Sequence, residues 1–216
     1  MSDNQKTFED KKYVLIKNAV DSKIIDLIST YALLDEKNNL TLEKGKHPQI
    51  HNSHSQYADC LMDSMLLEMQ QLMEANTGLK LYPTYSYYRV YRPGAILEKH
   101  KDRPSCEIST TITLKFNYLE ADYKWPIYIE GAECAMETGD LVIYRGCEVE
   151  HWREEFIAPK GSYHIQVFLH YVDANGPYAD YKYDRRPSIG FNKERNLDRI
   201  ISETYVPNKH YIIFSP

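Results

Sequence analysis

The sequence has few cysteines and no close cysteine pair. The four cysteines lie at positions 60, 106, 134 and 147. A disulfide-stabilised secreted domain usually shows paired cysteines at short spacings, so this pattern favours reduced thiols. The polar segment 1–11 also lacks the apolar stretch of a signal peptide. We therefore expect a cytoplasmic protein.

Long hydrophobic runs and basic blocks are missing as well. The longest apolar run, residues 24–34, is interrupted by Asp26, Ser29 and Thr30, so no segment is expected to cross a membrane. The formal net charge is −5, and no Lys- or Arg-rich block alternates with aromatic residues. This composition argues against nucleic acid or an anionic membrane as the main partner. We therefore expect a protein, a peptide or a small molecule as the main partner or substrate.

The length and composition are those of one soluble globular domain. The chain has 216 residues, of which 43% are hydrophobic and 26% charged. It also has 19 tyrosines but only 6 phenylalanines. Tyrosine joins a large apolar ring to a polar tip, so it suits half-polar cavities and binding surfaces as well as cores.

The first 80 residues are predicted to be mainly helical. Asp21 can cap a helix whose apolar residues recur at helical spacing up to Leu33. A second helix is expected over residues 58–74, with Gly78 as its stop. The polar segment 38–55 between them is expected to be a loop.

From residue 81 the pattern becomes one of short strands. Side chains alternate along residues 85–91, 111–116 and 163–171, and the Pro93-Gly94 and Gly139-Asp140 pairs indicate turns. Many short strands with few helices among them predict an all-β sandwich or barrel. We predict one domain with three parts: an N-terminal helical region (1–80), a β core (81–175) and a C-terminal tail packed on the core (176–216).

One set of residues has the composition of a metal site. His100 and Asp102 are two positions apart, so on an extended segment both side chains lie on one face. His151 follows a later strand. Two imidazoles and one carboxylate on one octahedral face leave positions open, which is typical of Fe(II) oxygenases. An isolated His-x-Asp triplet is more often solvated or structural than metal-binding, but here both histidines follow a turn and a strand.

Four segments resemble a known family: RVYRPGAILEKHKDR (89–103), ISTTITLKF (108–116), TGDLVIYRGCEVEHWREEF (138–156) and HIQVFLHYVD (164–173). They are similar to the 2-oxoglutarate/Fe(II) dioxygenases of the prolyl-hydroxylase-like group, over roughly residues 80–175. The resemblance implies a double-stranded β-helix (jelly-roll, cupin-like) core with His100, Asp102 and His151 as iron ligands and catalytic centre. It also implies dioxygen and 2-oxoglutarate as co-substrates, ascorbate as an accessory reductant, and C–H hydroxylation coupled to conversion of 2-oxoglutarate to succinate.

The same resemblance places residues toward 2-oxoglutarate, with one departure. Tyr91 matches a position where relatives use tyrosine toward the co-substrate, and Tyr118 is a weaker match. Relatives carry Arg or Lys at the start of the last barrel strand to pair with the distal carboxylate. The matching position here is occupied by His164. The charge could come instead from the remaining candidates: Arg89, Arg153 and Lys160.

Other readings remain open beside these. A cupin-like barrel that binds a metal or small ligand without 2-oxoglutarate chemistry is the main alternative function. Tyr91 could belong to the core, and His170 and Gln166 fit buried hydrogen-bonding residues. The HPQIHNSH segment holds His47, His51 and His54 without a carboxylate or cysteine nearby, so a solvated or substrate-covering loop is favoured over a second metal site.

Overall fold

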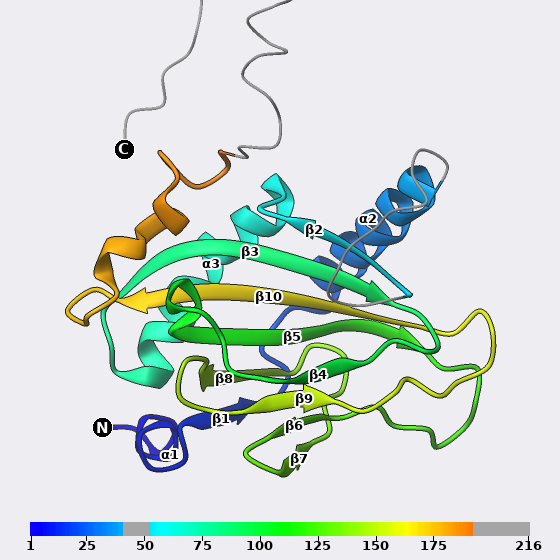
Figure 1. The fold of residues 1–216 in the computed structure, drawn as a ribbon, viewed down its shortest axis with the longest axis horizontal. Coiled ribbons are helices and arrows are strands. Elements are labelled where there is room, and N and C mark those ends of the chain that lie inside the picture. The colour runs from blue at the N-terminus through cyan, green and yellow to red at the C-terminus, as the bar shows by residue number, and fades with distance from the viewer. Residues whose placement is uncertain (41–51, 192–216) are drawn as a thin grey trace, which may run out of the picture.

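The computed structural model describes residues 1–40 and 52–191, and its core is two antiparallel sheets packed face to face (Figure 1). The major sheet has the strand order β1-β8-β5-β10-β3-β2, and the minor sheet the order β4-β9-β6-β7. The major strands are β1 (Tyr13–Ile16), β2 (Ser53–Tyr57), β3 (Leu81–Tyr91), β5 (Ile108–Asn117), β8 (Leu141–Arg145) and β10 (Tyr163–Asp173). The minor strands are β4 (Leu97–His100), β6 (Ile127–Ile129), β7 (Ala132–Cys134) and β9 (His151–Arg153). This arrangement is the predicted mainly-β core.

The helices cover the outer face of the major sheet. They are α1 (Asp3–Lys11), α2 (Ser22–Leu40) and α3 (Cys60–Thr77). The short 3-10 helices η1 (Pro104–Cys106) and η2 (Ala179–Arg185) instead contact each other, where the Ser105 hydroxyl donates to Asp184. Helix α3 begins where the Asp59 side chain accepts hydrogen bonds from two backbone N–H groups, and it ends at Gly78, as expected, with φ of +75°. Its methionine- and leucine-rich face packs against the sheet and closes the main hydrophobic core. The bounds of α2 also agree with a start after Asp21.

Strict alternation along β3 and β10 determines what faces the interior of the sandwich. The two strands pair antiparallel, with Tyr91 opposite His164, Arg89 opposite Gln166, Tyr87 opposite Phe168 and Tyr85 opposite His170. Because side chains in a strand alternate between faces, all eight residues lie on the face that looks toward the minor sheet. This inner face is polar and aromatic, whereas the other face of the same strands builds the aliphatic core.

Two strands lie in the region that the sequence predicted to be helical. β1 and β2 occupy opposite edges of the major sheet. The expected loop 38–55 is therefore wrong at both ends: α2 continues to Leu40, and β2 begins at Ser53. His54 lies on β2 and is 2.8 Å from the Asp35 carboxylate, so it is a paired strand residue rather than part of a loop. His47 and His51 lie outside the described residues.

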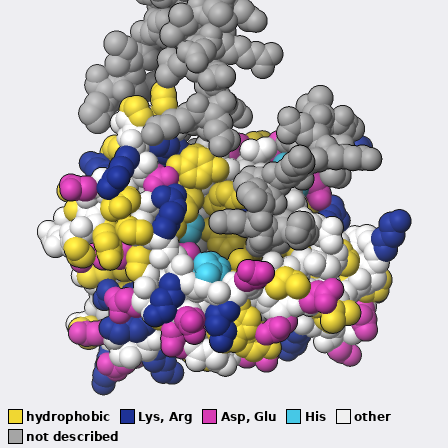
Figure 2. All heavy atoms as spheres, viewed as in Figure 1, with side chains coloured by type: hydrophobic (Ala, Val, Ile, Leu, Met, Phe, Trp, Pro, Cys, Tyr) yellow, Lys and Arg dark blue, Asp and Glu magenta, His cyan; other side chains and the backbone are white. Residues whose placement is uncertain are grey.

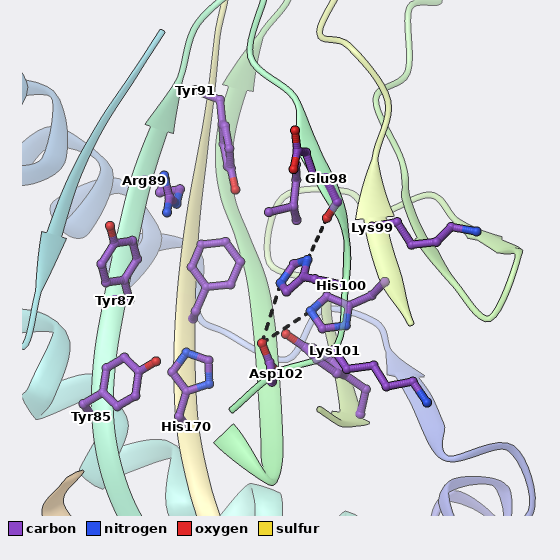
Figure 3. Close-up of a pocket in the computed structure, with 14 residues that line it drawn as sticks. Tyr85, Tyr87, Arg89, Tyr91, Glu98, Lys99, His100, Lys101, Asp102 and His170 are labelled. Carbon is purple, nitrogen blue, oxygen red and sulfur yellow. Dashed lines mark hydrogen bonds and ion pairs between the residues drawn. The ribbon is translucent and has the colours of Figure 1, made fainter. Parts of the chain in front are cut away.

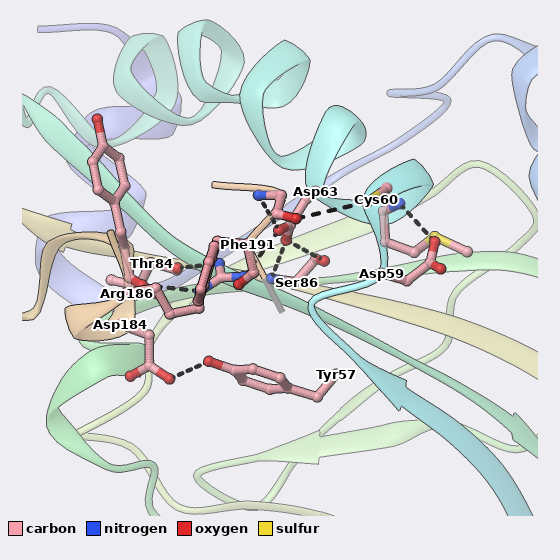
Figure 4. Close-up of polar contacts among 12 residues, drawn as sticks. Tyr57, Asp59, Cys60, Asp63, Thr84, Ser86, Asp184, Arg186 and Phe191 are labelled. Carbon is pink, nitrogen blue, oxygen red and sulfur yellow. Dashed lines mark hydrogen bonds and ion pairs between the residues drawn. The ribbon is translucent and has the colours of Figure 1, made fainter. Parts of the chain in front are cut away.

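The tail after β10 is held to the body by buried charges (Figure 4). Arg186 donates to Asp63 on α3 over 3.1 Å, and both side chains are almost completely buried. Arg186 also donates to the Thr84 carbonyl of β3, and Asp63 accepts from the backbone and hydroxyl of Ser86. An ion pair with this many hydrogen bonds offsets much of the cost of burying two charges. The described part of the tail is thus fixed against α3 and β3.

Two findings bear on the environment of the chain. Within residues 1–40 and 52–191, no helix combines the length and apolarity needed to span a bilayer. The four cysteines are free thiols, two of them buried.

Candidate metal centre

The structure brings His100, Asp102 and His151 together at the mouth of the sandwich (Figure 3). His100 ends β4 and His151 begins β9, and the two are partners in the antiparallel register of the minor sheet. Asp102 follows two residues after His100. Its Oδ1 lies 3.7 Å from Nε2 of His100 and 3.6 Å from Nε2 of His151. Each of the three therefore presents one ligand atom to a shared point.

Backbone carbonyls orient both imidazole rings. Nδ1 of His100 lies 2.7 Å from the Glu98 carbonyl oxygen, and Nδ1 of His151 lies 3.2 Å from that of Val149. A carbonyl can only accept, so Nδ1 carries the hydrogen and Nε2 keeps its lone pair. Burial lowers the pKa of His151, with the nearby His100 acting in the same direction against the carboxylate of Asp102. The neutral ring is the form that binds a metal ion.

The carboxylate of Asp102 is positioned by its own set of contacts. Its backbone N–H donates to the Gly146 carbonyl over 2.9 Å, and Ser109 donates to Oδ2 over 3.2 Å, which leaves Oδ1 directed at the histidines. A Cβ atom on Gly146 would overlap Asp102 and the Cys106 carbonyl. Position 146 therefore requires glycine for the close approach of this loop to the carboxylate.

A second group of ligand-type atoms, from Asp102, Cys106 and His170, lies beneath the first. Burial raises the pKa of the Cys106 thiol well above its ordinary value and lowers that of His170 to about 4, so both are neutral. His170 Nδ1 is 2.8 Å from the Ser109 hydroxyl, and Cys106 Sγ is 3.0 Å from the Tyr85 hydroxyl. A protonated thiol is a poor metal ligand, and these contacts describe a hydrogen-bonded layer that supports Asp102. His170 and Gln166 are both buried hydrogen-bonding residues, as expected from the sequence.

A cavity of about 630 Å³ opens beside the three residues. This volume lies within the range of small-molecule sites. The major sheet contributes an aromatic wall and Arg89, and β4, the segment directly after it and β9 contribute the three candidate ligands. The complete lining is Tyr85, Tyr87, Arg89, Tyr91, Leu97, Glu98, Lys99, His100, Lys101, Asp102, Tyr144, His151, Phe168 and His170. Figure 2 shows this hollow with a histidine at its edge.

Arg153 is a fully buried cation without a carboxylate partner among the described residues. It lies two positions after His151 on β9, so both side chains lie on the inner face of the minor sheet. Its guanidinium donates to the Trp125 carbonyl and, over 3.4 Å, to Gln166 Oε1. Its Nε has no acceptor in the described chain, and neither does the buried hydroxyl of Tyr91. Two polar groups without partners inside an aromatic enclosure indicate a site built for a polar ligand.

His164 is a neutral hydrogen-bonding residue. Its Nδ1 lies 2.8 Å from the Tyr118 hydroxyl and its Nε2 lies 2.5 Å from Gln166 Oε1. Burial lowers its pKa well below the ordinary value, and the adjacent Arg153 acts in the same direction. A neutral imidazole with both nitrogens engaged cannot supply the positive charge that the family position usually carries.

The remaining predicted cations lie in different places. Arg89 lines the cavity from β3, with 5% of its surface exposed. Lys160 is exposed in the turn before β10 and is not among the described cavity-lining residues.

Tyr118 belongs with Tyr91, Trp125 and Phe156 to a buried aromatic cluster around Arg153. Arg103, which sits on the rim, pairs with Asp184 over 2.8 Å.

The sequence did not predict two residues that support the site. Ser109 and Gly146 gave no motif of their own, because their contacts with His170 and Asp102 join positions distant in the chain. Gly146, directly after β8, was a local signal, since glycine beside a strand end often marks close approach of another segment.

No protein-family model and no curated protein matches this sequence. Solved structures do. A prolyl-4-hydroxylase from Pseudomonas putida is 16% identical with a TM-score of 0.58, over 78% of this chain and 96% of that one. The 2-oxoglutarate-dependent carbocyclase SnoK from nogalamycin biosynthesis is 14% identical with a TM-score of 0.62, over 81% and 85%. HygX from Streptomyces hygroscopicus, solved with nickel and 2-oxoglutarate bound, is 10% identical with a TM-score of 0.56, over 81% and 88%.

These neighbours are 2-oxoglutarate- and Fe(II)-dependent oxygenases, and prolyl hydroxylases are among them. At such low sequence identities, the structural similarity establishes the fold alone. The chain has the jelly-roll core of these enzymes with helices on its outer face. The fold expected from the sequence resemblance is thereby confirmed.

Proposed function

We propose that this protein is an Fe(II)- and 2-oxoglutarate-dependent dioxygenase that hydroxylates a C–H bond of a protein, peptide or small-molecule substrate. One observation carries the proposal. The three candidate ligands lie together, and Arg153, which is buried and has no carboxylate partner among the described residues, lies on the same strand as the ligand His151. His151 and Arg153 are two residues apart on β9, which separates their Cα atoms by about 6.6 Å. That spacing suits a short dicarboxylate held at the metal by one end and at Arg153 by the other.

The donor set fits Fe(II). Two imidazoles and one carboxylate, each offering one atom, are the donor set typical of non-haem Fe(II) oxygenases, and all three residues line the cavity. His100, Asp102 and His151 would hold the ion. When bound there, Fe(II) with 2-oxoglutarate would supply dioxygen activation and the oxidising power for C–H cleavage, with succinate and carbon dioxide as co-products.

The enclosure around Arg153 fits the distal carboxylate of 2-oxoglutarate. Arg153 would donate a charge-assisted pair of hydrogen bonds, and the hydroxyl of Tyr91 would donate a further one. Tyr118 keeps its hydroxyl on His164 and, with Trp125 and Phe156, would exclude water from Arg153. A dry surrounding strengthens the ion pair, because the local dielectric constant is low.

Hydroxylation is the part of the proposal that depends on the substrate. The similar solved structures include hydroxylases and also a carbocyclase and an epimerase, so one fold hosts several outcomes of the same oxidation. We favour hydroxylation because prolyl hydroxylases are among the neighbours and the sequence segments around the three ligands resemble that group.

The proposal can be tested without a substrate. Anaerobic addition of Fe(II) and then 2-oxoglutarate to the metal-free protein should produce a weak visible charge-transfer band that needs both components. His100→Ala should abolish the band, and Lys101→Met, which changes an exposed rim residue beside the ligands, should retain it. Under air, the loaded protein should convert 2-oxoglutarate slowly to succinate.

Iron binding without the band and without succinate formation would contradict the proposal. That result would favour the cupin-like alternative, a barrel that binds a metal or small ligand without this co-substrate.

A further inference from the structure

Arg89 is a second buried cation that has no carboxylate partner among the described residues. Its NH1 group donates to the Ser53 hydroxyl over 3.3 Å, and its guanidinium carbon lies 4.9 Å from the centre of the Tyr87 ring. It lines the cavity with only 5% of its surface exposed. A buried guanidinium with one neutral acceptor and one aromatic contact lacks the anion that would compensate its desolvation.

Arg89 and Arg153 reach into different parts of the interior. Arg153 comes from the minor sheet and donates to Gln166 on β10. Arg89 comes from β3 and donates to Ser53 on β2, the edge strand on the other side of β3 from β10. Their acceptors therefore lie on opposite sides of β3, although both guanidinium groups lie close enough to Tyr91 to act on its hydroxyl. With Arg153 assigned to 2-oxoglutarate, Arg89 would remain for a second anion, and Figure 3 shows it on the β3 wall of the cavity between Tyr87 and Tyr91.

A wall of rings lies beside Arg89. Tyr87 and Phe168 have ring centres 6.4 Å apart, and Tyr85 and His170 have theirs 4.5 Å apart in a tilted contact. All four residues line the cavity and lie on neighbouring strands. Rings arranged along two paired strands form an aromatic surface that can contact the apolar body of a ligand.

We propose that Arg89 binds an anionic group of the substrate, and that the substrate is a small organic acid whose apolar body lies on the wall formed by Tyr85, Tyr87 and Phe168. The proposal rests on the proposed function, because it assigns Arg153 to 2-oxoglutarate. A carboxylate or phosphate forms paired, charge-assisted hydrogen bonds with a guanidinium, whereas a neutral group would leave Arg89 uncompensated.

The experiment measures binding of chosen probes to the full chain loaded with Ni(II), which supports no turnover, and with 2-oxoglutarate. The acidic probes are 3-phenylpropionate and 2-phenylethyl phosphate, and the neutral probe is 3-phenylpropanol. Each is titrated by calorimetry into the wild-type protein and into Arg89→Met, Arg89→Lys and Lys101→Met. Methionine keeps the length of the side chain and removes its charge, and Lys101→Met removes a nearby but exposed charge.

We expect at least one acidic probe to bind the wild type, and Arg89→Met to weaken it about tenfold or more through loss of the charged hydrogen bonds. Arg89→Lys should restore part of the affinity, and Lys101→Met should change it by less than about twofold. The preferred acid reports whether the site suits a carboxylate or a phosphate. Binding of 3-phenylpropanol and of 2-oxoglutarate should be the same in Arg89→Met as in the wild type.

Three results would overturn the proposal: no acidic probe binds the wild type, the acids bind Arg89→Met as well as the wild type, or Arg89→Met loses affinity for 2-oxoglutarate. A wild-type protein that fails to bind 2-oxoglutarate contradicts the proposed function instead. The acid titrations with the Ni(II) protein alone then still decide the role of Arg89.

Discussion

Replacing Arg153 with methionine is expected to weaken 2-oxoglutarate binding without weakening the fold. Affinity for 2-oxoglutarate should fall while the free energy of unfolding does not, because Arg153 is fully buried and, among the described residues, has no carboxylate partner. In the ligand-free protein its charge is held by the Trp125 carbonyl, a long contact to Gln166 and the Trp125 ring. Burial lowers the pKa of Arg153, which reflects the cost of keeping this charge away from water.

The magnitudes follow from that environment. Truncating one partner of a buried, hydrogen-bonded charge pair costs about 2–5 kcal/mol, so the Kd for 2-oxoglutarate should rise by roughly thirtyfold to several thousandfold. Methionine fills a similar volume without a charge, so the variant avoids the cost of burying an uncompensated cation, which outweighs the loss of hydrogen bonds to Trp125 and Gln166. The free energy of unfolding of Arg153→Met should therefore equal or exceed that of the wild type.

Calorimetric titration of 2-oxoglutarate into the Ni(II)-loaded variants measures the first effect, and urea unfolding of the metal-free proteins measures the second. Arg89→Met and Lys160→Met serve as matched controls, because each removes another cation that the sequence offered for the same carboxylate. An unchanged Kd in Arg153→Met would refute the assignment. If Arg89→Met instead folds stably and loses affinity for 2-oxoglutarate, Arg89 on β3 binds the distal carboxylate.

Three further outcomes test the site and its support. Asp102→Ala should abolish Ni(II) and Fe(II) binding in calorimetry together with any succinate formation, because it removes the shared carboxylate; retained metal binding would exclude Asp102 as a ligand. Gly146→Ala should lower metal affinity by about tenfold or more, since its Cβ would displace Asp102 and the Cys106 carbonyl, and wild-type affinity in this variant would contradict the close approach seen here. Burial opposes ionisation of Asp184, but hydrogen bonds led by that from Arg103 outweigh it and lower its pKa to about 2. Because this folded-state pKa lies below the unfolded value, Asp184 should contribute about 2 kcal/mol above pH 4 and lose it as the pH falls toward 2. Asp184→Asn, which tolerates the local φ of +53°, should show that deficit in urea unfolding at pH 6 and a shrinking deficit below pH 4; an equal deficit at both pH values would refute the linkage.

Local periodicity was sufficient to predict the strands and what they present to the interior. Alternation along residues 85–91 placed Arg89 and Tyr91 on one side of their strand, and alternation along 163–171 placed His164 and Gln166 on one side of theirs; the pairing of β3 with β10 brings these two sides onto one face. The reason is that the period of two is a property of the strand itself and needs no knowledge of its partners. The helix ends at Asp21 and Gly78 were equally local, because capping depends on the few adjacent residues.

Edge strands were the features that the sequence missed. β1 and β2 are short, and the burial along each is mixed rather than alternating. Each exists because it pairs with a strand far along the chain, β1 with β8 and β2 with β3. Pairing of this kind is decided by the whole sheet, so propensity over a few residues could not reveal it.

The sequence by itself determined the three residues of the candidate metal centre, since His100 and Asp102 are a local pair and His151 follows a recognisable strand. Only the tertiary structure showed the burial, partners and charge state of the cations that the sequence offered for 2-oxoglutarate. His164 holds the expected position in the sequence, but burial and its contacts with Tyr118 and Gln166 keep it neutral. Arg153 comes from a different strand and enters the same enclosure unpaired. Charge state and partner are properties of the three-dimensional surroundings, and those surroundings exist only once β9 packs against β10.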